Sequence, residues 1–267
     1  MLVQIKNLAW ATGLALGLTS PAWAGSRTIK VVDDVPSQLT TAKLQQLQGG
    51  WSGGGGGTSV RWNGRRLFLD LLMFNQRGLR YKSFLPDYGG DPYNLANLVL
   101  NEWTQTEFSV GSIQAQAAFS SVEWYYTNEL PREVTEGYDK YYIPDTLRVE
   151  ELDPKLVAYY RGKPHKFQVH IVEQDFLSLD LISQVALVLH ETLRHVQIGF
   201  GVEKEDYFTE MNLQKATAIY LFCRPSIRWG SYLLFLMSPK AHLLEQFHGP
   251  EQAFFEKHCQ EPKWFAN

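Results

Sequence analysis

The hydrophobic pattern is clearest in the second half of the chain, where a predicted strand leads into a predicted helix. Over residues 166–173 apolar and polar side chains alternate, and this period of two predicts a half-buried β-strand. Residues 181–196 are then strongly apolar, with Ser178 or Asp180 available as an N-cap. They predict a long, largely buried helix that ends near Gly199.

Earlier segments contain residues typical of a hairpin turn and of helix N-termini. Asn63-Gly64 follows one short strand-like segment and precedes another, and this pair suits the positive φ angles of a type I′ hairpin turn. Asp91-Pro92 and Asp153-Pro154 each combine a capping residue with a proline suited to the first turn of a helix. Helices are predicted over residues 92–108, 112–126 and 207–222, with a short one after Asp153-Pro154 that extends to about Tyr160.

Together these elements predict an α+β fold, a helix-rich single domain over residues 58–267 with a small antiparallel sheet. Before this domain, residues 25–57 form a polar arm and a glycine-rich stretch. Five consecutive glycines, Gly53–Gly57, permit close backbone approach, but the Gly-Lys-Ser/Thr tripeptide of a phosphate loop does not follow. The glycine run therefore predicts a linker or the entry to a strand.

The first 24 residues have the form of a secretory signal peptide. Lys6 is their only charge, and the apolar stretch over residues 8–18 is too short to span a bilayer. Ala22-Trp23-Ala24 has the small-x-small form of a cleavage site. Export is expected, to the periplasm, the outer membrane or the medium, whereas an uncleaved membrane anchor is the alternative. No later segment is apolar for long enough to span.

Composition excludes several classes of protein. Apolar residues make up 45% of the chain and charged residues 20%, which is typical of a globular domain and excludes wholesale disorder. The formal charge of −3 gives no basic field for nucleic acid. The two cysteines, Cys223 and Cys259, can pair in an oxidising compartment, and two buried free thiols are the alternative.

The predicted buried helix carries an unusual polar segment, His190-Glu191-Thr192-Leu193-Arg194-His195. Unpaired charge inside a core is strongly unfavourable, so these side chains need partners or a function. The order of a strand, a short turn and a buried Leu-His-Glu helix resembles the active-site unit of the zincin metallopeptidases. It also resembles exported bacterial proteins of uncharacterised function that share a glycine-rich stretch and a Leu-His-Glu helix. The likeness covers about residues 165–210.

The resemblance implies a zinc ion and a catalytic base. In zincins two histidines one helical turn apart bind zinc, and the glutamate beside the first one activates the metal-bound water. Carried to this chain, the ligands are His190, His195 and Glu210, and the base is Glu191. Glu210 is chosen because a third ligand comes from the following helix in one class of zincins. Other acidic residues near that helix are Glu203, Glu205 and Asp206.

The chain departs from the zincin motif at one position. The second ligand is expected at residue 194, where this chain has an arginine, which cannot bind zinc because it stays protonated. His195 lies about 140° around an ideal helix from His190, so joint coordination requires a π-bulge. Dipeptidyl peptidase III has this longer spacing, but with glycine where Arg194 stands. The alternative is a structural role, in which Glu191 pairs with Arg194 or His195.

Two functions from different classes follow. The first is a zinc-dependent hydrolase, metallopeptidase-like, that acts on a peptide or an envelope protein. The second is a non-catalytic binding or scaffold protein of the cell envelope with a degenerate zincin-like core. Other candidate residues have weaker patterns: His165 and His170 at the predicted strand, the carboxylate pair Glu150 and Glu151, and the C-terminal His242, His248 and His258.

Overall fold

The computed structural model describes residues 30–31, 57–71, 90–107, 110–130, 152–163, 166–202, 207–223, 225 and 227–239. Several predictions lie outside these residues. They are the signal peptide over residues 1–24, most of the arm over residues 25–57, the acidic Glu150, Glu151, Glu203, Glu205 and Asp206, the histidines His165, His242, His248 and His258, and Cys259.

The described strands form two sheets. The larger sheet has the order β1 (Lys30–Val31), β4 (Glu123–Thr127), β7 (Lys166–Val172) and β6 (Ala158–Lys163). It is mixed, because β1, β4 and β7 run parallel and β6 pairs antiparallel with β7. The smaller sheet is antiparallel and has the order β3 (Arg65–Phe68), β2 (Thr58–Trp62) and β5 (Lys155–Leu156).

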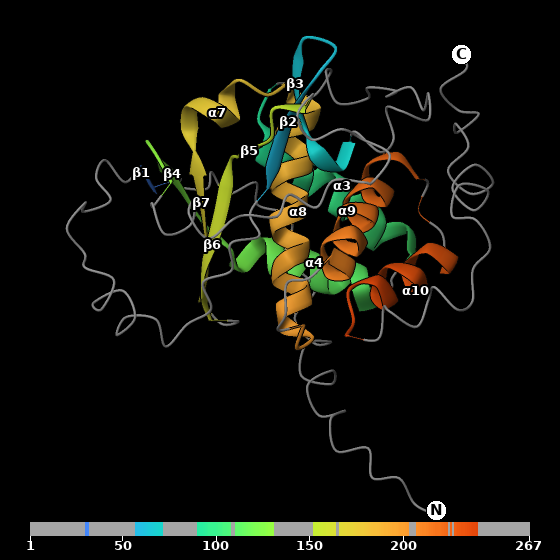
Figure 1. Ribbon diagram of the computed structural model, residues 1–267. Helices are drawn as coiled ribbons and strands as arrows, with labels where there is room; N and C mark the ends of the chain where they lie inside the picture. Colours follow the sequence, from blue (N-terminus) through green and yellow to red (C-terminus); the bar gives the residue numbers. More distant parts are fainter. Residues whose placement is uncertain are drawn as a thin grey trace, which may run out of the picture.

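Helix α8 lies at the centre of the described fold. The described helices are α3 (Pro92–Glu107), α4 (Val110–Ser121), α7 (Glu173–Leu177), α8 (Leu181–Gly199), α9 (Tyr207–Phe222) and α10 (Ile227–Leu236). Helix α8 packs against α3, α4, α9 and strand β3. Figure 1 shows it between the larger sheet on one side and the other long helices on the opposite side. The fold is therefore α+β, as the sequence predicts, with its long apolar helix in the middle.

Local sequence determines both ends of α8. The side chain of Asp180 accepts a hydrogen bond of 2.8 Å from the backbone nitrogen of Ser183, so Asp180 is the N-cap. At the other end Gly201 has φ +80°, and its N–H bonds to the carbonyl of Ile198. The N–H of Val202 reaches back to the carbonyl of Gln197, which completes a Schellman motif.

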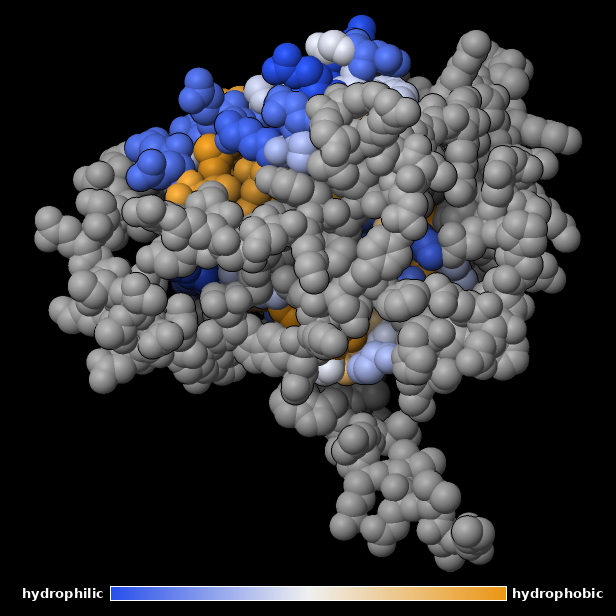
Figure 2. All heavy atoms as spheres, in the orientation of Figure 1, coloured by the Kyte–Doolittle hydropathy of each residue, from blue (hydrophilic) through white to orange (hydrophobic). Residues whose placement is uncertain are grey.

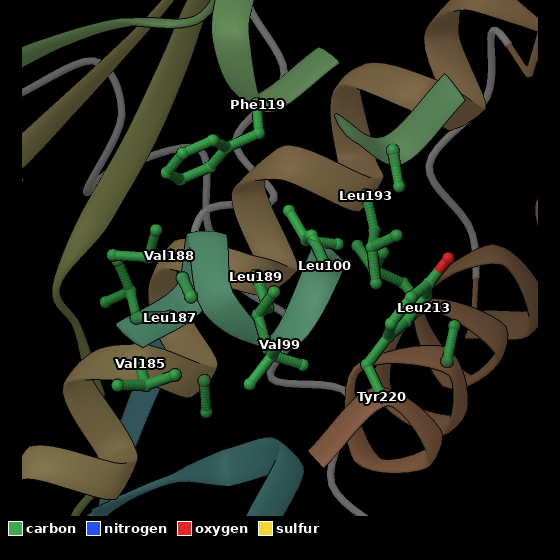
Figure 3. Close-up of a cluster of buried hydrophobic side chains, with 14 of the residues drawn as sticks. Val99, Leu100, Phe119, Val185, Leu187, Val188, Leu189, Leu193, Leu213 and Tyr220 are labelled. Carbon is green, nitrogen blue, oxygen red and sulfur yellow. The ribbon is translucent and has the colours of Figure 1, made fainter. Parts of the chain in front are cut away.

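The main core forms where α8 meets its neighbours (Figure 3). Side chains along α8 are buried from Val185 to Ile198 without interruption, which requires packing partners on every side of the helix. The labelled core residues are Val185, Leu187, Val188, Leu189 and Leu193 of α8, Val99 and Leu100 of α3, Phe119 of α4, and Leu213 and Tyr220 of α9. Burying each such side chain contributes about 1.5–3 kcal/mol, so this contact is a major source of stability.

Most elements agree with the hydrophobic pattern. The hairpin turn has φ 48° at Asn63 and 77° at Gly64, as a type I′ turn requires. Strand β7 buries Phe167, Val169 and Ile171, the face predicted from the alternation. Asp91 caps α3 by accepting a 3.1 Å hydrogen bond from the backbone nitrogen of Tyr93.

One helix prediction is wrong in part, and another is wrong. The helix predicted over residues 112–126 ends at Ser121, and Glu123–Thr127 is strand β4, because its aromatic and β-branched residues pair with β7. The short helix predicted after Asp153 is replaced by strands β5 and β6. Asp153 has φ 44° and forms an ion pair with Arg66 of β3, so it turns the chain into the smaller sheet and does not cap a helix.

The described surface includes a polar hairpin. Figure 2 shows mainly hydrophilic atoms over the β2–β3 hairpin, where Arg61, Asn63 and Arg65 are exposed. Within the part of the chain that the structure describes, no helix is both long and apolar enough to cross a membrane. Cys223, at the end of α9, is disulfide-bonded, and the only other cysteine in the sequence is Cys259.

Gly57 is the glycine of the five-residue run that the structure describes, and we predict that it does not tolerate a side chain. A Cβ at this position would lie 2.6 Å from the Phe68 ring and 3.2 Å from Leu187. Both neighbours are fully buried, so moving either one would disturb the close-packed core. Gly57→Ala is expected to lower the free energy of unfolding by about 1–3 kcal/mol, measured by denaturant titration.

Gly199 provides the matched control for this prediction. It lies in the last turn of α8, and a Cβ there would meet no atom of the described residues within 4 Å. Gly199→Ala is expected to leave the unfolding free energy unchanged or to raise it slightly. Equal losses in the two variants would contradict the packing argument for Gly57.

Candidate functional site

The polar side chains of α8 belong to a buried cluster that three elements build. Asp70, which follows β3, His190, Glu191 and Arg194 of α8, and Glu210 of α9 are each at most 4% exposed. Titratable side chains are almost never buried this completely unless they are paired. The cluster is therefore the candidate functional site of the described chain.

His190 is held between two carboxylates. Its Nδ1 lies 2.8 Å from Oδ2 of Asp70, and its Nε2 lies 3.5 Å from Oε1 of Glu210. The imidazole and the Phe68 ring are nearly perpendicular, with their centroids 5.3 Å apart. Burial lowers the pKa of His190, but the charges of Asp70 and Glu210 outweigh burial and raise it to about 9. The imidazole is therefore protonated at neutral pH.

Arg194 links α8 to α9. Its Nη2 donates to Oε2 of Glu210 in a buried ion pair. Its Nη1 donates to Oε1 of Gln197 at 3.2 Å, and the amide of Gln197 donates in turn to the carbonyl of Thr209 at 3.2 Å. The two oxygens of Glu210 thus face two cationic groups, His190 and Arg194, which stand one helical turn apart on α8.

Glu191 anchors the residue that ends the glycine run. Its Oε1 accepts a 2.9 Å hydrogen bond from the backbone nitrogen of Gly57, across 134 positions of sequence. Its Oε2 is buried and has no hydrogen-bond partner among the described residues. Burial raises the pKa of Glu191 to about 7, against the lowering effects of His190, Arg194 and the Gly57 hydrogen bond. The expected pair between Glu191 and Arg194 or His195 is not formed, because Arg194 pairs with Glu210.

His195 lies away from this cluster. Its ring stacks on Phe167 of β7, with centroids 4.6 Å apart and planes 1° from parallel, and its Nδ1 lies 3.4 Å from the Ser121 hydroxyl. Helix α8 is a regular α-helix from Leu181 to Gly199, without the π-bulge that would bring residues 190 and 195 together. The structure therefore brings His190 and Glu210 together and leaves His195 at the larger sheet.

These residues do not fit a three-ligand zinc centre in this arrangement. The structure brings only His190 and Glu210 together, and Glu210 is engaged by a guanidinium that would repel a divalent cation. Among the described residues, no group of three or more His, Cys, Asp or Glu side chains is placed to hold a metal ion. One feature agrees with a metal ligand: Asp70 holds Nδ1 of His190, while Nε2 makes no hydrogen bond to any described residue and lies 3.5 Å from Oε1 of Glu210.

His170 of β7 does not reach the cluster either. It lies between the rings of Tyr125 and Tyr159, at centroid distances of 5.0 Å and 4.8 Å. Strand alternation places it opposite the core-facing residues Val169 and Ile171. Burial and the charge of Arg161 lower the pKa of His170 to about 4, so its ring is neutral. It extends an aromatic row across the sheet.

Sequence reasoning missed Asp70 and Gly57. Asp70 interrupts the apolar run Leu67-Phe68-Leu69-Asp70-Leu71-Leu72, and one charge inside such a run is a signal that the charge needs a buried partner. The sequence does not identify that partner, because 120 positions separate Asp70 from His190. Gly57 is hidden among equivalent glycines and is distinguished only by its contacts.

Comparison with known proteins adds no relative. No family model matches the chain, no curated protein matches it, and no solved structure matches it.

The pair of Arg194 and Glu210 can be tested with a double-mutant cycle. Arg194→Met leaves Glu210 without its arginine and Glu210→Gln leaves Arg194 without its carboxylate, so each is expected to lower the unfolding free energy by about 3–5 kcal/mol. The double variant removes both charges and is expected to lose less than the sum of the two. Denaturant unfolding of the four proteins measures the difference. Strictly additive losses would rule out a direct pair.

The pKa values of the cluster predict a stability that decreases as the pH rises. When the pKa of a group is higher in the folded state than in the unfolded state, its contribution to stability is complete at pH values below the unfolded-state pKa. That contribution is lost as the pH rises to the folded-state pKa. For Glu191 this window runs from 4.5 to about 7, and for His190 from 6.5 to about 9. In the unmodified chain the unfolding free energy should decrease between pH 5 and pH 7, and Glu191→Gln should remove this decrease. Denaturant unfolding at each pH measures it. A variant with an unchanged slope in this window would contradict the assignment.

Proposed function

We propose that this chain is an exported bacterial protein that acts by binding or as a scaffold in the cell envelope, without catalysis. In this proposal α8 and α9 form a degenerate zincin-like core, in which a buried ion network takes the place of a metal centre. Asp70, His190, Arg194 and Glu210 then serve to hold the hairpin, α8 and α9 together.

One observation carries this proposal: Arg194 stands where a second metal-binding residue would be needed. It follows His190 by one helical turn, and its guanidinium binds the carboxylate of Glu210. Two cationic side chains, His190 and Arg194, face the carboxylates of Asp70 and Glu210. These four groups are therefore charge-compensated without an added ion, which supports a structural role.

Two features support export. The first 24 residues have the form of a signal peptide, with Ala22-Trp23-Ala24 as its cleavage site. Cys223 is disulfide-bonded, and disulfides persist in compartments outside the cytoplasm. Both features favour a protein of the periplasm, the outer membrane or the medium.

A zinc-dependent hydrolase is the second candidate, and one observation favours it. Asp70 fixes Nδ1 of His190 and leaves Nε2 facing Glu210, which is how a metal-binding histidine is oriented in many enzymes. In that case Glu191 would be the general base, with a peptide or an envelope protein as substrate. Arg194 and the position of His195 oppose this candidate.

Metal analysis of the protein from its own export route separates the two functions. Residues 25–267 are purified, dialysed against zinc and measured for bound metal and for thermal stability. The binding or scaffold function predicts less than about 0.1 zinc ions per chain and an unchanged melting temperature, because Arg194 already neutralises Glu210.

The hydrolase makes the opposite prediction in the same measurement. It requires about one zinc ion per chain, lost in His190→Ala, together with a higher melting temperature in zinc. His195→Ala is the matched comparison, because His195 lies at the larger sheet outside the cluster. Stoichiometric zinc that depends on His190 would overturn the proposed function.

A further inference from the structure

The helix hairpin formed by α3 and α4 carries very little charge. Residues 92–121 include two charged side chains, Glu102 and Glu107, whereas the chain average of 20% would give about six. Helices at the surface of a soluble protein normally keep charged residues on the side that faces water. Depletion of charge is the compositional mark of a surface that another protein covers. The outer side of this hairpin is therefore a candidate interaction surface.

Burial and helical spacing define which residues form this surface. The inner sides of both helices belong to the core around α8, where Figure 3 shows Val99 and Leu100 of α3 and Phe119 of α4. The outward side chains are amides, a hydroxyl and aliphatic groups, and none of them is charged. These residues, named here the amide face, are each exposed or partly exposed: Asn94, Leu98, Asn101 and Gln105 on α3, and Val110, Ile113, Ala117 and Ser120 on α4.

The amide face also carries exposed apolar side chains. Leu98 is 45% exposed and Val110 is 57% exposed, and they are two of the three large hydrophobic residues that are exposed in the described chain. The third is Leu177 on α7, which is 62% exposed. A single exposed leucine needs no explanation, but two large aliphatic groups on one uncharged face provide anchors for a partner.

Side-chain hydrogen bonds hold the two helices of this surface together. The amide of Gln116 donates to Oδ1 of Asn97 at 2.7 Å, and the hydroxyl of Thr104 donates to the carbonyl of Ser112 at 3.4 Å. Both helices also pack on α8. Because the backbone of the amide face is already fixed, a partner that binds there orders little more than side chains.

The chemistry of the amide face selects an uncharged partner. Phosphate groups of lipid or nucleic acid require lysine or arginine, and residues 92–121 contain neither. A charged protein surface would lose hydration against this face and gain no countercharge. Each primary amide has both a donor and an acceptor, so asparagine and glutamine on two identical surfaces can bond to each other. The net charge of −3 also opposes the approach of two copies through charged faces.

The size of the hairpin is sufficient for a weak but specific interface. Helix α3 has 16 residues, so it is about 24 Å long, and two helices side by side are about 20 Å wide. The face therefore projects about 500 Å² per copy and about 1,000 Å² in a symmetric pair, which is the lower end of the range for specific interfaces. An interface of this size corresponds to a dissociation constant in the micromolar range.

We infer that two copies of this chain associate through the amide face, with α3 and α4 of one copy packed on α3 and α4 of the other around a two-fold axis. The two hairpins together form a four-helix arrangement in which the same surface serves both partners. The amide face shares no residue with the buried cluster of Asp70, His190, Arg194 and Glu210, so the inference does not depend on what that cluster does.

Sedimentation velocity of residues 25–267 from the chain's own export route tests this inference. Between about 1 and about 300 μM the unmodified chain is expected to pass from monomer to dimer. Leu98→Glu places like charges in the interface and is expected to raise the dissociation constant at least about 10-fold. Leu177→Glu is the matched control, because it adds the same charge at an exposed leucine outside the amide face, and it is expected to change the constant less than about twofold.

Two further variants keep the test decisive. Ala117→Glu adds a charge to the α4 side of the face and is expected to weaken association as Leu98→Glu does, so it replaces Leu98→Glu if that variant melts at a lower temperature. Leu98→Lys is also expected to be monomeric alone. Mixed with Leu98→Glu at low ionic strength, it should form a heterodimer, because opposite charges then face each other across the two-fold axis.

Three results would overturn the inference. They are an unmodified chain that stays monomeric at about 300 μM, an equal loss of association in Leu98→Glu and Leu177→Glu, and a mixture of Leu98→Glu and Leu98→Lys that stays monomeric at low ionic strength. Dimers that Leu98→Glu and Ala117→Glu weaken and Leu177→Glu does not would support it.

Discussion

The buried pair of Arg194 and Glu210 is the interaction on which the centre of this structure depends. Helix α8 is covered on every side, so any charge it carries must find its partner inside the protein. Arg194 finds Glu210 on α9, and Glu210 in turn approaches His190, which Asp70 holds from the hairpin side. Four charged groups thus connect three elements of the fold.

The burial of α8 also explains why its polar residues are distributed around the helix. His190 and Arg194 face the hairpin end and α9, whereas His195 faces the larger sheet and stacks on Phe167. Glu191 faces the start of β2, where it accepts the N–H of Gly57. His190 and Arg194 share Glu210, whereas Glu191 and His195 meet other neighbours, so residues adjacent in sequence serve different contacts.

Residue 194 is the position at which the zincin motif and the structure of this chain can be compared directly. The sequence shows an arginine there, which is incompatible with a zinc ligand, but it does not show what the arginine does. In the structure its guanidinium binds the carboxylate predicted as the third ligand, Glu210. The buried guanidinium therefore pairs with the carboxylate that the zincin resemblance assigns to a metal.

The sequence by itself determined the elements with strong local signals: the Asn63-Gly64 hairpin, the alternating strand β7, and α8 with its Asp180 cap. It also identified His190 and Glu210 as candidates that come together. Only the tertiary structure decided that residues 123–127 form a strand and that His195 points to the sheet. It also decided that Asp70 belongs to the cluster and that Gly57 bonds to Glu191. Local patterns set the backbone within a segment, whereas these choices depend on contacts between residues far apart in the chain, which no local pattern contains.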